Sequence, residues 1–305
     1  MFKKDLISIS DLGDDLPEVV NLGLRLKRDR YTTHEHVQGR SMGMIFEKSS
    51  TRTRVSLETA MYQLGGNAIY LNPNDMQMGR GETVADTAKV LSGMLDIITY
   101  RTFKHENVEA LAKNSSVPVI NALDDREHPL QLLADFMTIA EKKNRFDGLK
   151  FAYVGDGNNM VNSILLTCAM TGMDVSIATP KGFEADSRFV DRAKNIAKNT
   201  GSKVEISGDP VSAVSDADIV YTDVWVSMGQ EKEKEEKEKA FRKFQVNGDL
   251  VSHAKKDYIF MHCLPAHRGM EVTDEVADSI NSVIFQEAEN RLHSAKAAIV
   301  YLLQN

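Results

Sequence analysis

Residues 42–54 read MGMIFEKSSTRTR, and they join a short apolar run to a stretch rich in hydroxyl and guanidinium groups. The apolar run is typical of a buried strand. Residues 55–64 then place apolar side chains at helical spacing until two glycines end the pattern. The first amides of a helix lack intrahelical partners and the dipole is positive at that end, so the segment predicts an anion site at a helix N-terminus. A cap by Ser50 or Thr51 would explain the hydroxyls alone, whereas two arginines at this position favour a phosphate group as the guest.

Strands and helices are expected to alternate through the first half of the chain. An amphipathic helix is expected near 10–30. It is followed by expected strands at 42–46, 68–71, 97–100 and 117–120, and by expected helices at 51–64, 84–95, 108–113 and 129–142. This alternation predicts a parallel α/β domain.

The pattern restarts after a polar stretch at 142–148. Strands are expected at 151–155, 175–178, 204–206, 219–221, 259–261 and 283–285, with helices around 164–165 and at 187–199. The fold class is therefore α/β with two doubly wound parallel-sheet domains, 1–146 completed by a C-terminal helix at 287–305, and 147–286. Because such sheets bind ligands at the carboxyl ends of their strands, we expect the active site in a cleft between the two domains.

A charged run at 230–239 alternates acidic and basic residues at i, i+4 spacing. This pattern predicts a solvated helix face, and we assign it no chemistry.

Composition narrows the class of partner. The chain has 305 residues, a net charge of −7 and two cysteines, which disfavours nucleic acid, a disulfide scaffold and a multi-cysteine metal site. No apolar run reaches the roughly 18 residues of a membrane helix, and the first residues lack the apolar region of a signal peptide. We expect a cytoplasmic protein with a small anionic substrate and no membrane partner.

Further reactive side chains follow other predicted strands. Arg101 comes just past one strand, and His128-Pro129-Leu130-Gln131 places a histidine and a glutamine around a helix start. One such residue is structural more often than not, but three loops of this kind at one sheet edge indicate a site.

These motifs, together with the segments 223–229 (DVWVSMG) and 262–265 (HCLP), resemble the aspartate/ornithine carbamoyltransferase family, most closely its ornithine-specific members. The resemblance runs nearly end to end. It implies transfer of the carbamoyl group of carbamoyl phosphate to the δ-amine of L-ornithine, giving L-citrulline and phosphate in arginine metabolism or biosynthesis. It also implies a homotrimer or a multiple of trimers.

The resemblance carries roles over residue by residue. It implies catalytic roles for Arg101, His128, Asp223 and Cys263, and ornithine binding by Asn159, Asp223, Ser227 and Met228. Carbamoyl-phosphate binding is implied for Ser50, Thr51, Arg52, Thr53, Gln77, Arg101, His128, Gln131, Cys263, Leu264 and Arg291. Gln77 lies in a loop that reaches a neighbouring subunit's site in the family.

The chemistry agrees with these roles. An amine that attacks a carbamoyl carbon builds negative charge on the carbonyl oxygen, which arginine, hydroxyl and imidazole donors would stabilise. No covalent intermediate, cofactor or metal is needed, and Asp223 with Cys263 could orient the amine. Another acceptor such as putrescine stays open as an alternative, since a diamine also favours a carboxylate.

Three other classes of protein are alternatives to a carbamoyltransferase. A dinucleotide-binding dehydrogenase would fit the glycine-rich turn at 155–160, but Met160 replaces the third glycine and no acidic residue ends the next strand. A hydrolase with Cys263 as nucleophile would leave the predicted anion site at the helix N-terminus unexplained. A two-domain anion-sensing protein would need the predicted anion site but not the residues around Asp223. A measurement of substrate turnover distinguishes such a binding protein from an enzyme.

Overall fold

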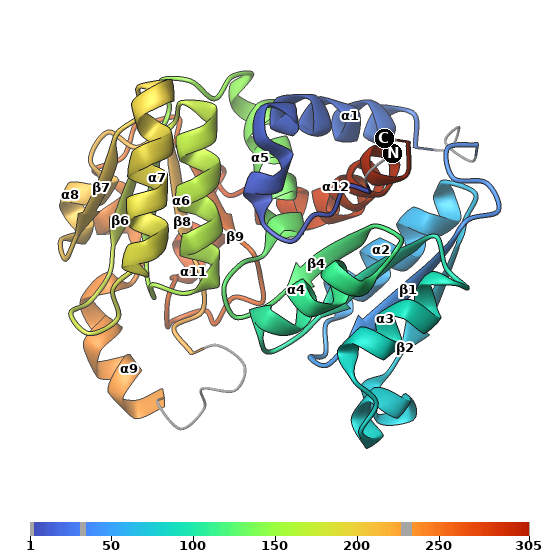
Figure 1. Cartoon of the computed structure of the whole chain (residues 1–305). Helices are drawn as coiled ribbons and strands as arrows, with labels where there is room; N and C mark the ends of the chain where they lie inside the picture. The colour runs from blue at the N-terminus through green and yellow to red at the C-terminus, as the bar shows by residue number, and fades with distance from the viewer. Residues whose placement is uncertain (1–2, 31–34, 227–233, 305) are drawn as a thin grey trace. The chain divides into compact units, whose positions relative to one another are not determined.

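The computed structural model describes residues 3–30, 35–226 and 234–304, and the chain forms two compact units (Figure 1). Unit 1 comprises Met1–Met137 and Glu289–Asn305, and unit 2 comprises Thr138–Ala288. The divisions fall within helices α5 (Pro129–Lys143) and α12 (Ile284–Gln304). The first lies nine residues before the boundary expected at 146/147 (146 − 137 = 9). The assignment of each domain to one substrate stays a prediction.

Unit 1 is built on a four-stranded parallel sheet in the order β2-β1-β3-β4. Its strands are β1 (Ser41–Phe46), β2 (Asn67–Leu71), β3 (Ile97–Arg101) and β4 (Val119–Leu123). Its helices are α1 (Leu16–Arg28), α2 (Thr51–Gln63), α3 (Val84–Ser92), α4 (His105–Asn114) and the unit 1 parts of α5 and α12, with 3-10 helices at Ile9–Asp15, Pro73–Asp75 and Gln77–Arg80. The predicted parallel α/β domain is confirmed.

Helices pack on this sheet because alternate strand residues point to the same face. Ile45, Ile98 and Tyr100 join residues of α3 and α4 in one buried cluster. Elsewhere in the unit, α1 approaches α5 and α12 closely at Gly23, where a Cβ would lie 2.6 Å from the Met137 sulfur. A larger residue at this position would require the end of the Met137 side chain to move.

Unit 2 is built on a five-stranded parallel sheet in the order β7-β6-β5-β8-β9. Its strands are β5 (Lys150–Val154), β6 (Asp174–Ala178), β7 (Val204–Ser207), β8 (Ile219–Thr222) and β9 (Ile259–His262). Its helices are α6 (Asn159–Thr171), α7 (Ser187–Thr200), α8 (Pro210–Val214), α9 (Lys234–Phe241), α10 (Gly248–Val251) and α11 (Asp274–Ala277), with a 3-10 helix at Arg242–Phe244. This is the second doubly wound sheet that the sequence predicts, and α6 and α7 lie side by side along it (Figure 1).

In each unit the strand order reverses direction at one point, between β1 and β3 in unit 1 and between β5 and β8 in unit 2. Ligands of open α/β sheets bind where the loops diverge at such a point, outside the carboxyl ends of the strands. The loops in question begin at Glu47, Thr102, Gly155 and Asp223. Each unit therefore places chemistry-bearing loops of the candidate site at its switch point.

The single helix expected at 10–30 is wrong. A 3-10 helix, Ile9–Asp15, precedes α1, and Gly13 within that segment forms a kink with φ +48° and ψ −131°. Glycine adopts this conformation readily, whereas other residues do not. The apolar periodicity continued through the break and concealed it.

The strand expected at 283–285 is also wrong, because α12 begins at Ile284. Extended pairing here is limited to a bridge between Phe260 and Ser282, and the Val283 amide bonds to the Phe260 carbonyl. A short apolar run does not distinguish a strand from the first turn of a buried helix. The strand expected at 117–120 is shifted to β4, since Pro118 has no amide to donate to the sheet.

The charged run at 230–239 is only partly described, from Lys234 onward, where α9 begins. Glu235, Glu236 and Lys239 are exposed as predicted, but Lys237 is 1% exposed. The prediction of a purely solvated face is therefore wrong at this residue.

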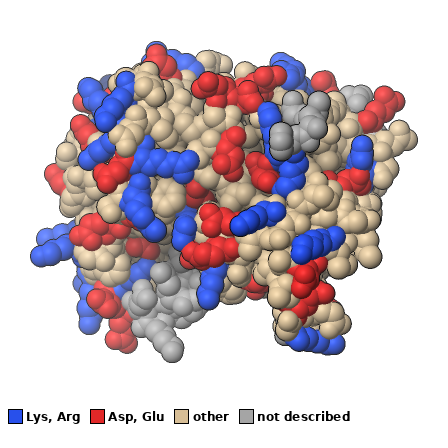
Figure 2. Space-filling view, viewed as in Figure 1, with Lys and Arg blue, Asp and Glu red and all other residues tan. Residues whose placement is uncertain are grey.

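No helix among the described residues is long and apolar enough to cross a membrane. On the face that Figure 2 shows, basic and acidic side chains are interspersed, without the single-sign stripe typical of nucleic-acid-binding proteins.

Candidate active site

In unit 1 helix α2 begins at Thr51, where the sequence predicts it. The Ser50 hydroxyl accepts from the Thr53 amide at 3.2 Å, which caps the helix. Thr51 and Arg52 occupy the first turn, with Arg52 partly buried. The first-turn amides and the adjacent guanidinium are groups of the kind that bind anions, and phosphate binding at this place stays a prediction.

Arg54, the second arginine of the motif, does not join this surface. Its guanidinium lies 3.8 Å from the centroid of the Tyr70 ring, and its Nε lies 3.5 Å from a carboxylate oxygen of Glu58. The argument that two arginines crowd the first turn is therefore wrong for Arg54. Arg54 follows Arg52 by two helical positions, which turns its side chain to a different face of α2.

Arg291, rather than Arg54, is the second arginine beside the N-terminus of α2. This residue of α12 donates to the Thr53 hydroxyl at 3.0 Å and to the side-chain oxygen of Gln131. Gln131 in turn donates to Asp135 at 2.8 Å, and all four side chains are buried. The network holds the Arg291 guanidinium in one orientation beside the first turn of α2.

His128, immediately before α5, is buried among guanidinium groups. Burial holds the pKa of His128 well below its usual value, and the charges of Arg291, Arg101 and Arg52 lower it further. The imidazole is therefore neutral near pH 7. The same three arginines concentrate positive charge around it, which suits a phosphate-bearing substrate.

We expect the stability of the protein to report this neutral histidine. In the unfolded chain His128 takes up a proton below about pH 6.5, whereas the folded protein keeps it neutral, so stability is present above that pH and is lost as the pH falls below it. Urea unfolding at pH 7.0, 6.0 and 5.5 without substrates should give a steeper loss for the wild type than for His128→Asn, by up to about 1.4 kcal/mol per pH unit. Equal slopes would mean that His128 is protonated in the folded state.

Arg101 is the last residue of β3 and is 5% exposed. Its Nη1 lies 3.5 Å from the Ala122 carbonyl oxygen, next to an irregularity in the β3–β4 pairing. Leu123 at that irregularity has φ +138°, a conformation that non-glycine residues rarely adopt. Strained backbone of this kind is characteristic of functional loops, and here it leads directly into the segment that carries His128.

Gln77 lies apart from these groups. It begins the 3-10 helix Gln77–Arg80, and both end residues are exposed. Its implied role in a neighbouring subunit's site stays a prediction.

In unit 2 the structure brings Asp223 and Cys263 together. The Cys263 thiol donates to Asp223 Oδ1 at 3.0 Å, and Asn158 donates to Asp223 Oδ2 at 2.8 Å. The two residues follow neighbouring strands, β8 and β9, so their loops meet at one sheet edge. Asn158 also caps α6, and the ornithine-binding role implied for its neighbour Asn159 stays a prediction.

His262 belongs to the HCLP motif, but the sequence predicts no partner for it and no role for Glu271. The Leu264 amide donates to His262 Nδ1 at 2.8 Å, so the imidazole proton is on Nε2, which lies 3.2 Å from Glu271 Oε1. Both side chains are fully buried. This pair fixes the loop that carries Cys263 and Leu264; the histidine of the HCLP motif was the available signal.

The remaining predicted residues of unit 2 are at loop ends. Asn159 is the first residue of α6, and Leu264 has φ +57° and precedes a cis Pro265 bond. Ser227 and Met228 lie outside the described residues.

Among the described residues, Asp223, His262 and Cys263 offer donor atoms within 4.8 Å of one another. Carboxylate, imidazole and thiolate are ligands that zinc accepts. Both His262 nitrogens already face hydrogen-bond partners, however, so the imidazole is not available as a ligand and we assign no metal to this group.

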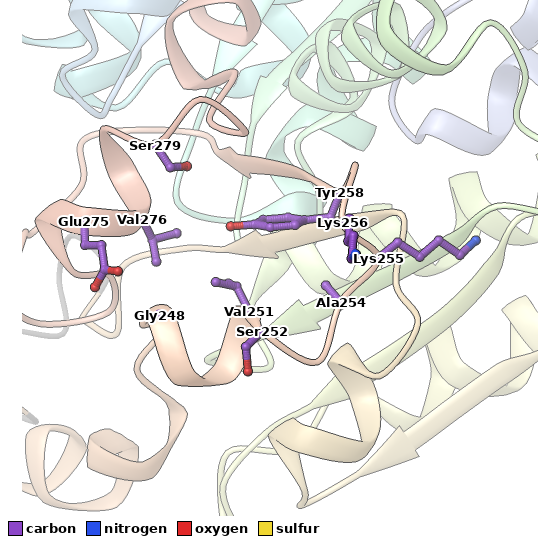
Figure 3. A pocket seen from close by; sticks show the side chains of 10 residues that line it. All are labelled: Gly248, Val251, Ser252, Ala254, Lys255, Lys256, Tyr258, Glu275, Val276 and Ser279. Atoms are coloured by element: carbon purple, nitrogen blue, oxygen red, sulfur yellow. The ribbon is translucent and has the colours of Figure 1, made fainter.

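A cavity of about 290 Å³ in unit 2 lies elsewhere (Figure 3). The Tyr258 side chain extends across it toward Val276. Tyr258 directly precedes β9, so the cavity is at the amino ends of the strands, whereas Asp223 and Cys263 follow the carboxyl ends. This cavity is therefore not part of the candidate site.

Comparison with protein-family models identifies both halves of the chain. Residues 4–141 match the model described as aspartate/ornithine carbamoyltransferase, carbamoyl-P binding domain, and residues 147–302 match the model of the Asp/Orn binding domain. The chain belongs to the aspartate/ornithine carbamoyltransferase family.

Individual relatives point to one branch of this family. A protein of Thermoplasma volcanium named ornithine carbamoyltransferase, catabolic, is 62% identical over 303 residues, covering 99% of each chain. Bacillus subtilis ornithine carbamoyltransferase is 52% identical over 304 residues, covering 99% of this chain and 95% of its own. The solved ornithine carbamoyltransferase from Pyrococcus furiosus has a TM-score of 0.96 at 51% identity, covering 99% of this chain and 98% of that one.

Proposed function

We propose that this protein is an ornithine carbamoyltransferase, which converts carbamoyl phosphate and L-ornithine into L-citrulline and phosphate. The C–N bond to the δ-amine forms, the C–O bond to phosphate breaks, and the proton lost by the amine leaves with the phosphate. The alternative acceptor putrescine is not supported, because relatives 62% and 52% identical over almost the whole chain are named for ornithine.

The observation that carries the proposal is the neutral His128 among three arginines. A guanidinium cluster at a helix N-terminus binds the phosphate, and a neutral imidazole can donate a hydrogen bond without giving up a proton. As the amine adds, negative charge grows on the carbonyl oxygen, and donors already fixed in place stabilise it without reorganisation. Arg101 and His128 are the donors that we assign to this oxygen.

Asp223 and Cys263 provide the other half of the chemistry. We assign Asp223 to a cationic nitrogen of ornithine and the Cys263 sulfur to orientation of the attacking amine, with Asn159, Ser227 and Met228 completing the ornithine site. A buried carboxylate held by Asn158 and Cys263 keeps one orientation, which is what precise placement of an amine requires. Leu264 lies beside Cys263 and is assigned to the carbamoyl group.

The direct test is product formation with three acceptors. Purified protein and carbamoyl phosphate are incubated with ornithine, putrescine or aspartate, and carbamoylated product and phosphate are quantified. We expect stoichiometric citrulline and phosphate with ornithine, and at least about tenfold lower kcat/KM with the other two, since each lacks a group that the ornithine site must pair. Folded protein that forms no citrulline would refute the proposal.

We further propose that the protein assembles as a trimer in which Gln77 contributes to the neighbouring subunit's phosphate site. Gln77 and Arg80 are exposed in a polar loop, and surface loops of this kind often carry function. Each site would then need residues from two chains.

Subunit mixing tests the shared site. Arg52→Ala and the double variant Gln77→Ala/Arg80→Ala should each be impaired, and after dissociation and reassociation together some sites regain both intact halves. Activity of the mixture should exceed the sum of the two parents. A mixture that never does so, although mass spectrometry shows exchanged subunits, would contradict the shared site.

We also propose a cytoplasmic role in arginine metabolism. The Thermoplasma volcanium relative is named a catabolic enzyme, which makes breakdown of citrulline a direction to test alongside its synthesis.

A further inference from the structure

An ion pair is buried in unit 2 beside the candidate ornithine site. Lys237 Nζ lies 2.7 Å from Asp156 Oδ2, and the two residues are 1% and 6% exposed. The ammonium also lies 5.4 Å from the centroid of the Phe183 ring. Removing two charges from water costs free energy that their attraction does not always recover. A gain in stability is therefore not enough to explain why this pair is buried.

Asp156 belongs to the turn between β5 and α6 at the switch point of the sheet. Its carbonyl accepts from the Tyr153 hydroxyl at 2.9 Å and from the Asn158 amide at 2.8 Å. At Gly157 a Cβ would lie 2.4 Å from the Glu184 backbone, so the turn is wedged against a second loop. Lys237 therefore holds a turn that is packed on several sides.

The turn leads directly to the carboxylate of the candidate site. Asn158, two residues after Asp156, donates to Asp223 Oδ2. Asp223 Oδ1 receives the Cys263 thiol and the Val224 amide. A continuous chain of contacts thus runs from Lys237 through Asp156 and Asn158 to Asp223 and Cys263.

We propose that Lys237 is a positioning residue for the acceptor amine: by pairing with Asp156 it fixes the turn from which Asn158 orients Asp223. The inference rests on the proposed function, because it takes Asp223 as the group that meets ornithine. Lys237 has no contact with substrate in this account and acts through the turn.

The ion pair also affects the charge near the candidate ornithine site. Burial raises the pKa of Tyr153 well above its usual value, and the nearby charges of Asp223 and Asp156 raise it further. The Asn158 side chain bonds to Asp223 two residues after Asp156, so both carboxylates belong to one small region. With Asp156 neutralised by Lys237, the charge that remains for the substrate is centred on Asp223 rather than shared between two carboxylates.

The test compares four variants with the wild type. Lys237→Met leaves Asp156 buried without its cation, Lys237→Met/Asp156→Asn removes both charges, Lys237→Arg keeps the cation, and Lys239→Met changes an exposed lysine of the same helix. Steady-state constants for ornithine and for carbamoyl phosphate are measured with the melting temperature of each protein.

We expect Lys237→Met to lower the melting temperature, and the double variant to recover much of that loss because no unpaired charge remains. In the double variant the KM for ornithine should still rise about tenfold, while the KM for carbamoyl phosphate stays within about twofold. Lys237→Arg should restore most of the ornithine affinity, and Lys239→Met should match the wild type.

The double variant shows whether Lys237 affects ornithine binding even if Lys237→Met does not fold. A wild-type KM for ornithine in that variant would show that the pair is only structural and would overturn the inference. An equal rise in both KM values would overturn it as well, because the effect would not be confined to the acceptor. Failure of the proposed function is a separate result, visible as absence of citrulline with the wild type and Lys239→Met.

Discussion

Arg52→Ala is expected to lower kcat/KM by about 10- to 150-fold while leaving the melting temperature nearly unchanged. A charge-assisted hydrogen bond to phosphate contributes about 1.5–3 kcal/mol, and each 1.36 kcal/mol corresponds to a tenfold change in rate. The stability of the fold should not depend on this residue, since the α2 cap is made by Ser50 and the Thr53 amide.

Arg54→Ala is the matched control for this variant. It removes the same kind of side chain two residues later on α2, but Arg54 stacks on Tyr70 and pairs with Glu58 instead of facing His128. Its kcat/KM should stay within about twofold of the wild type, because exposed pairs of this kind contribute little. An effect of Arg54→Ala equal to that of Arg52→Ala would move the anion site away from the His128 cluster.

Asp223→Asn is expected to have the second large effect, a loss of about 100-fold in kcat/KM for ornithine with little change in the KM for carbamoyl phosphate. The substitution keeps the shape of the side chain and removes the charge that would pair with an ammonium of the substrate. Removing one partner of a buried charge pair costs 2–5 kcal/mol, which contains the predicted loss. The melting temperature should fall only slightly, because the remaining amide oxygen can still accept from Cys263 and Val224 and only the bond from Asn158 loses its acceptor.

Asp191→Asn serves as the control, because Asp191 is an exposed acidic residue of α7 in the same unit. It should leave all kinetic constants unchanged. If Asp223→Asn instead raised both KM values equally, or left the ornithine constants unchanged, the carboxylate would not be the group that meets the acceptor.

The alternation of strands and helices could be predicted from the sequence because it depends on local features. The buried run at β1, the serine cap and the apolar spacing of α2 are all encoded within a few neighbouring residues. The same holds for Arg101 at the end of β3 and His128 before α5, since parallel strands bring their carboxyl ends to one sheet edge. The errors at 10–30 and 283–285 came from apolar runs whose spacing fits more than one structure.

Contacts between residues far apart in the chain could not be predicted in this way. Arg54 and Arg52 look equivalent in the motif, and only the orientation of α2 sends one to Tyr70 and the other toward His128. Lys237 looks like its exposed neighbours in the charged run, and only the packing of α9 against the β5–α6 turn buries it on Asp156.

The sequence by itself thus determined the α/β class, the N-terminus of α2 at which the anion site is predicted, and the family resemblance, because these depend on local spacing and on residue identity. The tertiary structure decided which charged groups face one another: Arg291 with Gln131 and Thr53, Cys263 with Asp223, and Lys237 with Asp156. Such pairs are set by how whole elements pack, and the direction of a side chain within a helix or loop carries no record of its distant partner until the packing is formed.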